Sequence, residues 1–279
     1  MIYIFGDSFS ASYPKVSFNG ETGSCWYEML QLEKKGVGDV LNYSKKGEGS
    51  YTSMKRLYNL VETGDINKTS KLVIMLSSQY RIPFEFLRDS IFKNDTTFNK
   101  DQDFDYLIDY WFNANGLIEK NEEHIKFIEK LFSSEQIEYL NKYSDIILST
   151  YLALKEEIDM ANLKNIYFLK TFSQLRKIKI ICFLCFDHGT TKYIDLEDNN
   201  LNDDYFKLHH EILWNVCLQE NVNNIFTDTP TNYRPNHLSY CNHRVLANII
   251  LNFFDKSDLD EKFHKNIIEN TQSGSFLYE

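Results

Sequence analysis

A serine near the start of the chain and a histidine near its end are the residues best placed for nucleophilic chemistry. Ser8 follows the apolar run at residues 2–5, which predicts a buried strand. Serine attacks poorly by itself, because it needs an imidazole to take its proton and donors for the oxyanion that forms. His237 lies between a predicted strand at 224–227 and a predicted helix at 240–254. In a parallel sheet both residues would reach the carboxyl edge, where ligand crevices form.

The other histidines are less favourably placed for this role. His188 follows the predicted strand at 177–186 and is the one rival in a similar position. The rest fall in predicted helices: His124, His209, His210, His243 and His264. His237 is therefore the predicted base.

The pattern of apolar residues predicts strands that alternate with helices. Apolar runs of strand length lie at residues 2–5, 37–43, 72–76, 177–186 and 224–227. Apolar residues at helical spacing lie at 25–32, 54–61, 204–218 and 240–254. Because a parallel crossover needs a long connection, this alternation predicts an α/β fold: a three-layer, five-stranded parallel sheet with helices on both faces.

The stretch from 83 to 165 is too long for an ordinary crossover. Its first part is aromatic and acidic, and residues 125–163 have the spacing of a long amphipathic helix. We therefore predict one domain, 1–279, that contains a helical, aromatic-rich insertion at 83–165. The aromatic residues are expected to form a small core of their own or a surface that stacks on carbohydrate. The polar tail, 255–279, is predicted to hold one short helix near 263–268 and to be otherwise loose or bound to a partner.

Composition narrows the classes of function. The 279 residues are 43% hydrophobic, enough for a full core, and 30 basic against 40 acidic residues leave a net charge of −10. That charge repels phosphate backbones, so nucleic acid is not an expected partner. Five scattered cysteines favour a reducing compartment and a cytoplasmic location. We expect no secretion signal, and because the longest apolar run is shorter than a membrane-spanning helix, no membrane association is expected.

A pair of cysteines with metal-ligand spacing is interpreted as core packing. Cys182 and Cys185 lie in a predicted strand, with His188 just beyond. Residues three apart in a strand point to opposite faces, so both thiolates could not easily reach one ion. We expect no metal site here, and the glycine turns do not match a phosphate-binding loop.

Both ends of the chain resemble the SGNH (GDSL) hydrolase family. Gly6-Asp7-Ser8-Phe9-Ser10 resembles the family's first sequence block, and His237-Leu238-Ser239, with His243, Leu246 and Ala247, resembles its last. Trp26 with Leu30, then Asn42 and Gly47, are similar to the segment that leads to the second block. The resemblance implies a serine nucleophile, no cofactor, and an oxyanion hole formed by the amides of Ser8 and Gly47 with a side chain from the third block. It also implies that Asp7 holds the turn by hydrogen bonds.

The chain departs from the family pattern twice. In Ser77-Ser78-Gln79-Tyr80, Gln79 occupies the place of the family's asparagine, and its amide can still donate. Arg234 stands three residues before His237, where the family has an aspartate. Asp228, at the end of the predicted fifth strand, is a candidate for the orienting acid, and a backbone carbonyl is an alternative. These departures resemble divergent members of the family, some encoded by phages, which would make a virion location an alternative.

Two functions from different classes follow. The first is an ester hydrolase that acts on an O-acyl group, for example acetyl on a saccharide, through a Ser8–His237 dyad or an atypical triad. The second is a weakened or inactive hydrolase fold kept as a binding or structural module in a phage or multiprotein assembly. The insertion at 83–165 is then a candidate surface for a protein partner or for self-association.

Overall fold

The structure is a computed structural model in which only part of the chain is described. The described residues are 1–7, 9–10, 16–18, 21–23, 26–33, 39–45, 48–77, 134–142, 145, 149, 152–153, 156–157, 160–186, 190–194, 196, 199–220, 238, 240–255, 262–263 and 277–278.

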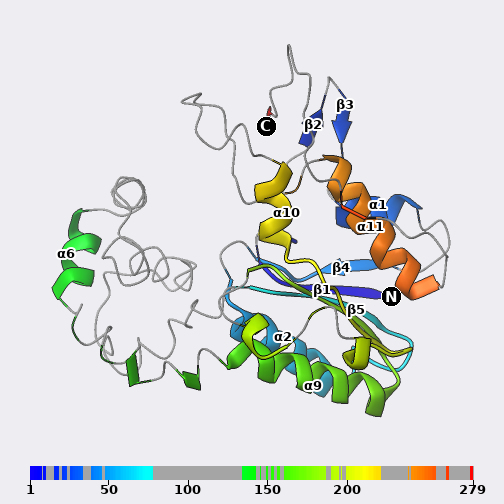
Figure 1. Cartoon of the computed structure of the whole chain (residues 1–279), viewed down its shortest axis with the longest axis horizontal. Coiled ribbons are helices and arrows are strands. Elements are labelled where there is room, and N and C mark those ends of the chain that lie inside the picture. The colour runs from blue at the N-terminus through cyan, green and yellow to red at the C-terminus, as the bar shows by residue number, and fades with distance from the viewer. Residues whose placement is uncertain are drawn as a thin grey trace.

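A five-stranded parallel sheet forms the centre of the fold (Figure 1). Its strands are β1 (Ile2–Phe5), β4 (Val40–Asn42), β5 (Lys71–Leu76), β6 (Lys179–Leu184) and β7 (Phe206–Leu208). They lie in the order β4-β1-β5-β6-β7, and every neighbouring pair is parallel. The predicted α/β class with five parallel strands is confirmed.

Alternate residues of the central strands pack on opposite faces of the sheet, as the period of a strand requires. One buried cluster contains Ile4, Val73 and Ile181, and the other contains Phe5, Ile74 and Cys182. Each large apolar side chain buried in this way stabilises the fold by about 1.5–3 kcal/mol. The strands are near-continuous apolar runs because both faces are covered.

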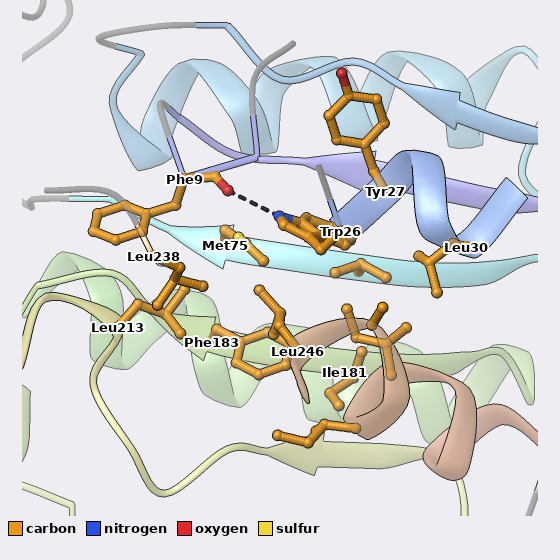
Figure 2. Packing of buried hydrophobic residues seen from close by; sticks show 14 of the residues in the cluster. Phe9, Trp26, Tyr27, Leu30, Met75, Ile181, Phe183, Leu213, Leu238 and Leu246 are labelled. Carbon is orange, nitrogen blue, oxygen red and sulfur yellow. Dashed lines mark hydrogen bonds between the residues drawn. The ribbon is translucent and has the colours of Figure 1, made fainter. Parts of the chain in front are cut away.

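Different helices cover the two faces (Figure 1). The cluster drawn in Figure 2 takes side chains from α1 (Trp26–Glu33), α10 (Leu213–Glu220) and α11 (Tyr240–Asp255). The other cluster takes them from α2 (Ser50–Glu62) and α9 (Ala161–Arg176). The helices expected near residues 25–32, 54–61 and 240–254 correspond to α1, α2 and α11.

The prediction of a helix over residues 204–218 was wrong for residues 204–212. The structure forms β7 at Phe206–Leu208 and begins α10 only at Leu213. The Asp203 carboxylate accepts hydrogen bonds from the amides of Tyr205 and Phe206, which turns the chain into a strand before a helix can start. The fifth strand is therefore β7, whereas residues 224–227 lie outside the described residues.

The connection between β5 and β6 includes helices α6 (Ser134–Lys142) and α9. Both overlap the long helix predicted over 125–163, but α9 continues to Arg176, so position 165 falls inside a helix. Lys177 ends α9 in the left-handed conformation, with φ 56°. Residues 78–133 lie outside the described residues, and the insertion at 83–165 stays a prediction.

Two lysines hold the end of α11 against the start of the sheet. Lys179 Nζ donates to the carbonyls of Phe253 at 3.1 Å and Phe254 at 3.0 Å. Lys71 Nζ lies 2.7 Å from the Asp255 carboxylate. Cations at a helix C-terminus satisfy its last carbonyls and complement its dipole.

A small antiparallel sheet joins distant parts of the chain. Its strands are β2 (Val16–Phe18), β3 (Glu21–Gly23) and β8 (Leu277–Tyr278), in the order β3-β2-β8. The tail was predicted without such structure, yet residues 277–278 pair with β2.

No helix in the described part of the chain is long and apolar enough to span a membrane.

Candidate functional site

A buried carboxylate organises the carboxyl edge of the sheet at the end of β1. Asp7 is fully buried, and its Oδ1 accepts a hydrogen bond from the Phe9 amide at 3.0 Å. Its Oδ2 accepts one from the Ser77 hydroxyl at 2.6 Å, and Cys185 Sγ lies 3.6 Å from Oδ1. Ser77 follows β5 and Cys185 follows β6, so one side chain joins the ends of three neighbouring strands.

Ser8 itself lies outside the described residues, but the residues on both sides of it are fixed. The Trp26 indole donates to the Phe9 carbonyl at 2.9 Å (Figure 2). The Asn42 amide donates to the Ser10 carbonyl at 2.6 Å, and the Ser10 hydroxyl donates to Ser44 Oγ at 2.8 Å. Three separate elements therefore hold the turn after β1.

Gly6 lets this turn approach β5 closely. A Cβ atom at this position would lie 2.5 Å from Ser10 Oγ and 2.7 Å from Met75 Cβ. Real Cβ contacts are longer, so any side chain would push the turn away from the sheet. The glycine of the Gly6-Asp7-Ser8 motif is required by packing.

The end of β5 receives hydrogen bonds from the start of two helices. The Ser77 carbonyl accepts from the Ser50 hydroxyl at 3.1 Å and from the Asn162 side-chain amide at 3.0 Å. Ser50 begins α2, and Asn162 lies in the first turn of α9. Gln79, the predicted oxyanion donor of this segment, lies outside the described residues.

The loop after β4 is held by an ion pair between Glu48 and Arg56. Glu48 is buried, and its carboxylate also accepts a hydrogen bond from the Ser53 hydroxyl at 3.1 Å. Burial raises the pKa of Glu48, and the Arg56 guanidinium offsets part of this rise. Gly47, the other predicted oxyanion donor, lies outside the described residues.

The predicted base, His237, and the candidate acid, Asp228, also lie outside the described residues, as does Arg234. Leu238, which follows His237 directly, is described and buried. It belongs to the same apolar cluster as Phe9, the residue after Ser8. In Figure 2 both side chains lie toward the end of the cluster to which β5 points. Phe9 and Leu238, each next in the chain to a predicted catalytic residue, thus share one apolar cluster.

His209 is a carboxyl-edge residue that the sequence assigned to a helix. It follows β7 directly, and its amide donates to the Cys182 carbonyl at 2.9 Å. The ring packs against Phe183 and Phe263, and Nδ1 accepts a hydrogen bond from the Glu211 amide at 3.1 Å. Burial lowers the pKa of His209 to about 3. The ring is therefore neutral near pH 7, with its proton on Nε2.

His243 is the other buried histidine of the described residues. It lies in α11, and burial lowers its pKa to about 4. Its Nδ1 is buried without a hydrogen-bond partner. A neutral, enclosed imidazole of this kind contributes packing to the core.

The cysteine pair points to opposite sides of the sheet, as predicted. Cys182 lies in the cluster with α2 and α9, and Cys185 lies in the cluster with α1 and α11. Burial raises the pKa of the Cys182 thiol. Among the described residues no group of His, Cys, Asp and Glu side chains could hold a metal ion. His188 lies outside them.

The comparisons with known proteins found no relative of this chain. No family model, no curated protein and no solved structure matches this chain. The chemistry proposed below therefore depends on the residues and their arrangement.

Proposed function

We propose that this protein is a serine ester hydrolase of the SGNH kind, with Ser8 as its nucleophile and His237 as its base. The observation that carries the proposal is the Asp7 carboxylate, which ties the turn containing Ser8 to the end of β5 through Ser77. A nucleophile must be held in place by its surroundings, and this turn is held by charge-assisted hydrogen bonds on a buried strand end.

The order of the strands supports a site at the carboxyl end of β1. When the five strands of the parallel sheet are numbered by their order in the chain, they lie side by side as second, first, third, fourth and fifth. This is the doubly wound, flavodoxin-like order. Such sheets bind ligands outside the carboxyl ends of the strands, where the order reverses beside the first strand. Because helices pack on both faces, we propose the three-layer arrangement of these folds, with residues 83–165 inserted between β5 and β6.

The position of Leu238 supports His237 as the base. Leu238 and Phe9 belong to one buried cluster, and each is the next residue in the chain after a proposed catalytic residue. Consecutive Cα atoms are about 3.8 Å apart. A Ser–His pair needs its side chains within hydrogen-bond reach, and the shared cluster of Phe9 and Leu238 is compatible with this requirement.

The proposed mechanism has two steps. Ser8 Oγ attacks the ester carbonyl while His237 takes its proton, and the oxyanion is stabilised by the amides of Ser8 and Gly47 and by the Gln79 side chain. The alcohol then leaves with the proton from His237, and water hydrolyses the acyl-serine by the same route in reverse. Asp228 is the candidate for orienting the imidazole, and an O-acylated saccharide is the proposed substrate class.

A fluorophosphonate probe tests the nucleophile. The wild type should be labelled and Ser8→Ala should not. Ser70→Ala is the matched control, because Ser70 precedes β5 at the opposite edge of the sheet, and it should be labelled like the wild type. Equal labelling of wild type and Ser8→Ala would refute the mechanism. A folded wild type that is never labelled would favour the alternative, a binding or structural module.

A further inference from the structure

One guanidinium group holds both ends of the loop that follows β4. Arg56, on α2, binds the Glu48 carboxylate with two nitrogens: Nη2 lies 2.5 Å from Oε1 and Nη1 lies 2.9 Å from Oε2. The same Nη1 donates to the Tyr43 carbonyl at the end of β4. The planar fork of arginine suits such two-point contacts, which lysine cannot reproduce.

The loop is also tied to β1 next to the predicted nucleophile. The Lys45 amide donates to the Gly6 carbonyl at 3.2 Å, and Ser53 Oγ lies 3.4 Å from the same carbonyl. Ser53 Oγ also donates to Glu48 Oε2. Arg56, Glu48 and Ser53 therefore connect α2, the β4 loop and the peptide that precedes Asp7 and Ser8.

The contribution of the Arg56–Glu48 ion pair to the stability of the fold is a weak explanation for its presence. A buried ion pair loses much of its attraction to the cost of removing two charges from water, and an apolar pair of similar volume often stabilises a fold as well. What the pair supplies is a fixed geometry for the backbone it holds. The residues it fixes, Tyr43 and Glu48, flank the segment that contains Gly47.

We propose that Arg56 is a positioning residue that holds the loop after β4, through Tyr43 and Glu48 on either side of Gly47, beside the Gly6 peptide that precedes Asp7 and Ser8. This inference rests on the proposed function, because Gly47 matters only if an oxyanion forms beside Ser8. Arg56 contacts the loop and α2, and it acts on the reaction through the backbone that it holds.

The test measures, for the variant Arg56→Lys, the rate of reaction with a probe separately from the affinity for the probe. This variant keeps the charge opposite Glu48 but loses the two-point contact. With a fluorophosphonate probe, we expect the maximal labelling rate to fall about 10- to 100-fold, because displaced oxyanion donors cost rates of this size. The probe concentration for half-maximal rate should stay within about twofold, because the loop contributes to the transition state rather than to initial binding.

Two further variants keep the test decisive. Lys164→Met, the control, breaks an exposed ion pair between α9 and Glu157 and should keep the wild-type labelling rate. Glu48→Gln keeps the volume of its side chain and weakens the pair from the other side, so it should slow labelling in the same way. It replaces Arg56→Lys if that variant does not fold.

The outcomes distinguish this inference from the proposed function. A wild type that is labelled at Ser8, with a folded Arg56→Lys or Glu48→Gln labelled equally fast, overturns the positioning role and leaves the hydrolase standing. A rate loss that merely follows the fraction of unfolded protein, measured by circular dichroism, also overturns it. A wild type without labelling at Ser8 removes the proposed function itself.

Discussion

Lowering the pH from 8 to 5 should destabilise this fold through two buried histidines. Burial lowers the pKa of His209 to about 3 and that of His243 to about 4, from an ordinary value of 6.5. Below pH 6.5 the unfolded imidazoles take up protons while the folded ones do not, so the unfolded chain binds more protons. The free energy of unfolding is highest above pH 6.5 and falls as the pH drops toward the folded pKa values.

The size of the effect follows from these values. One pKa unit corresponds to about 1.4 kcal/mol, and pH 5 lies about 1.5 units below the unfolded pKa and above both folded values. Each histidine should therefore lower the free energy of unfolding by about 2 kcal/mol between pH 8 and pH 5. The two together give about 4 kcal/mol, a large part of the stability of an ordinary domain.

Replacing each histidine by a residue that does not titrate isolates its contribution to the pH dependence of stability. His209→Asn keeps an acceptor for the Glu211 amide, and His243→Leu removes an imidazole whose Nδ1 has no partner. Urea unfolding at pH 8, 7, 6 and 5 should show each variant losing about 2 kcal/mol of the wild-type pH dependence. His210→Asn, at the exposed neighbour, should keep most of it. If all four proteins lose stability in parallel as the pH falls, neither imidazole is buried and neutral and the reasoning fails.

Two backbone positions give further predictions. Gly6→Ala should lower the free energy of unfolding by about 1–3 kcal/mol and abolish probe labelling, because the new Cβ would overlap Met75 and Ser10. Urea unfolding and the fluorophosphonate assay measure these two effects. Wild-type stability and labelling would contradict the prediction. Lys177→Gly should raise the free energy of unfolding by about 0.5–1 kcal/mol, because glycine adopts a left-handed helix end without strain; a lower midpoint in thermal unfolding would contradict it.

The central strands were predictable because a strand buried on both faces is a continuous run of apolar residues. The run from Ile180 to Leu184 is fully buried on both faces, so every residue in it is apolar. Strand β7 escaped prediction because it has only three residues and Lys207 interrupts its apolar pair. A sequence pattern needs several repeats to show its period, and the turn at Asp203 that starts β7 acts through the backbone.

The chemistry of the candidate site was less visible than its location. The Gly6-Asp7-Ser8 motif marks the end of β1, but the two side chains that bond Asp7, Ser77 and Cys185, lie 70 and 178 residues away. No local pattern contains such pairs, because they depend on which strands become neighbours. The Asn202-Asp203 pair is a local signal that could have placed His209 after a strand, because both side chains accept hydrogen bonds from amides at residues 205–208.

The lysine contacts at the end of α11 extend control of the candidate site to the far side of the molecule. A helix of 16 residues is a rod about 24 Å long. Anchoring its last turn through Lys71 and Lys179 fixes the tilt and axial position of the whole rod, and therefore the height at which Leu238 enters the core. Substitutions at these lysines would therefore act at a distance, on the depth at which Leu238 packs near the other end of the helix.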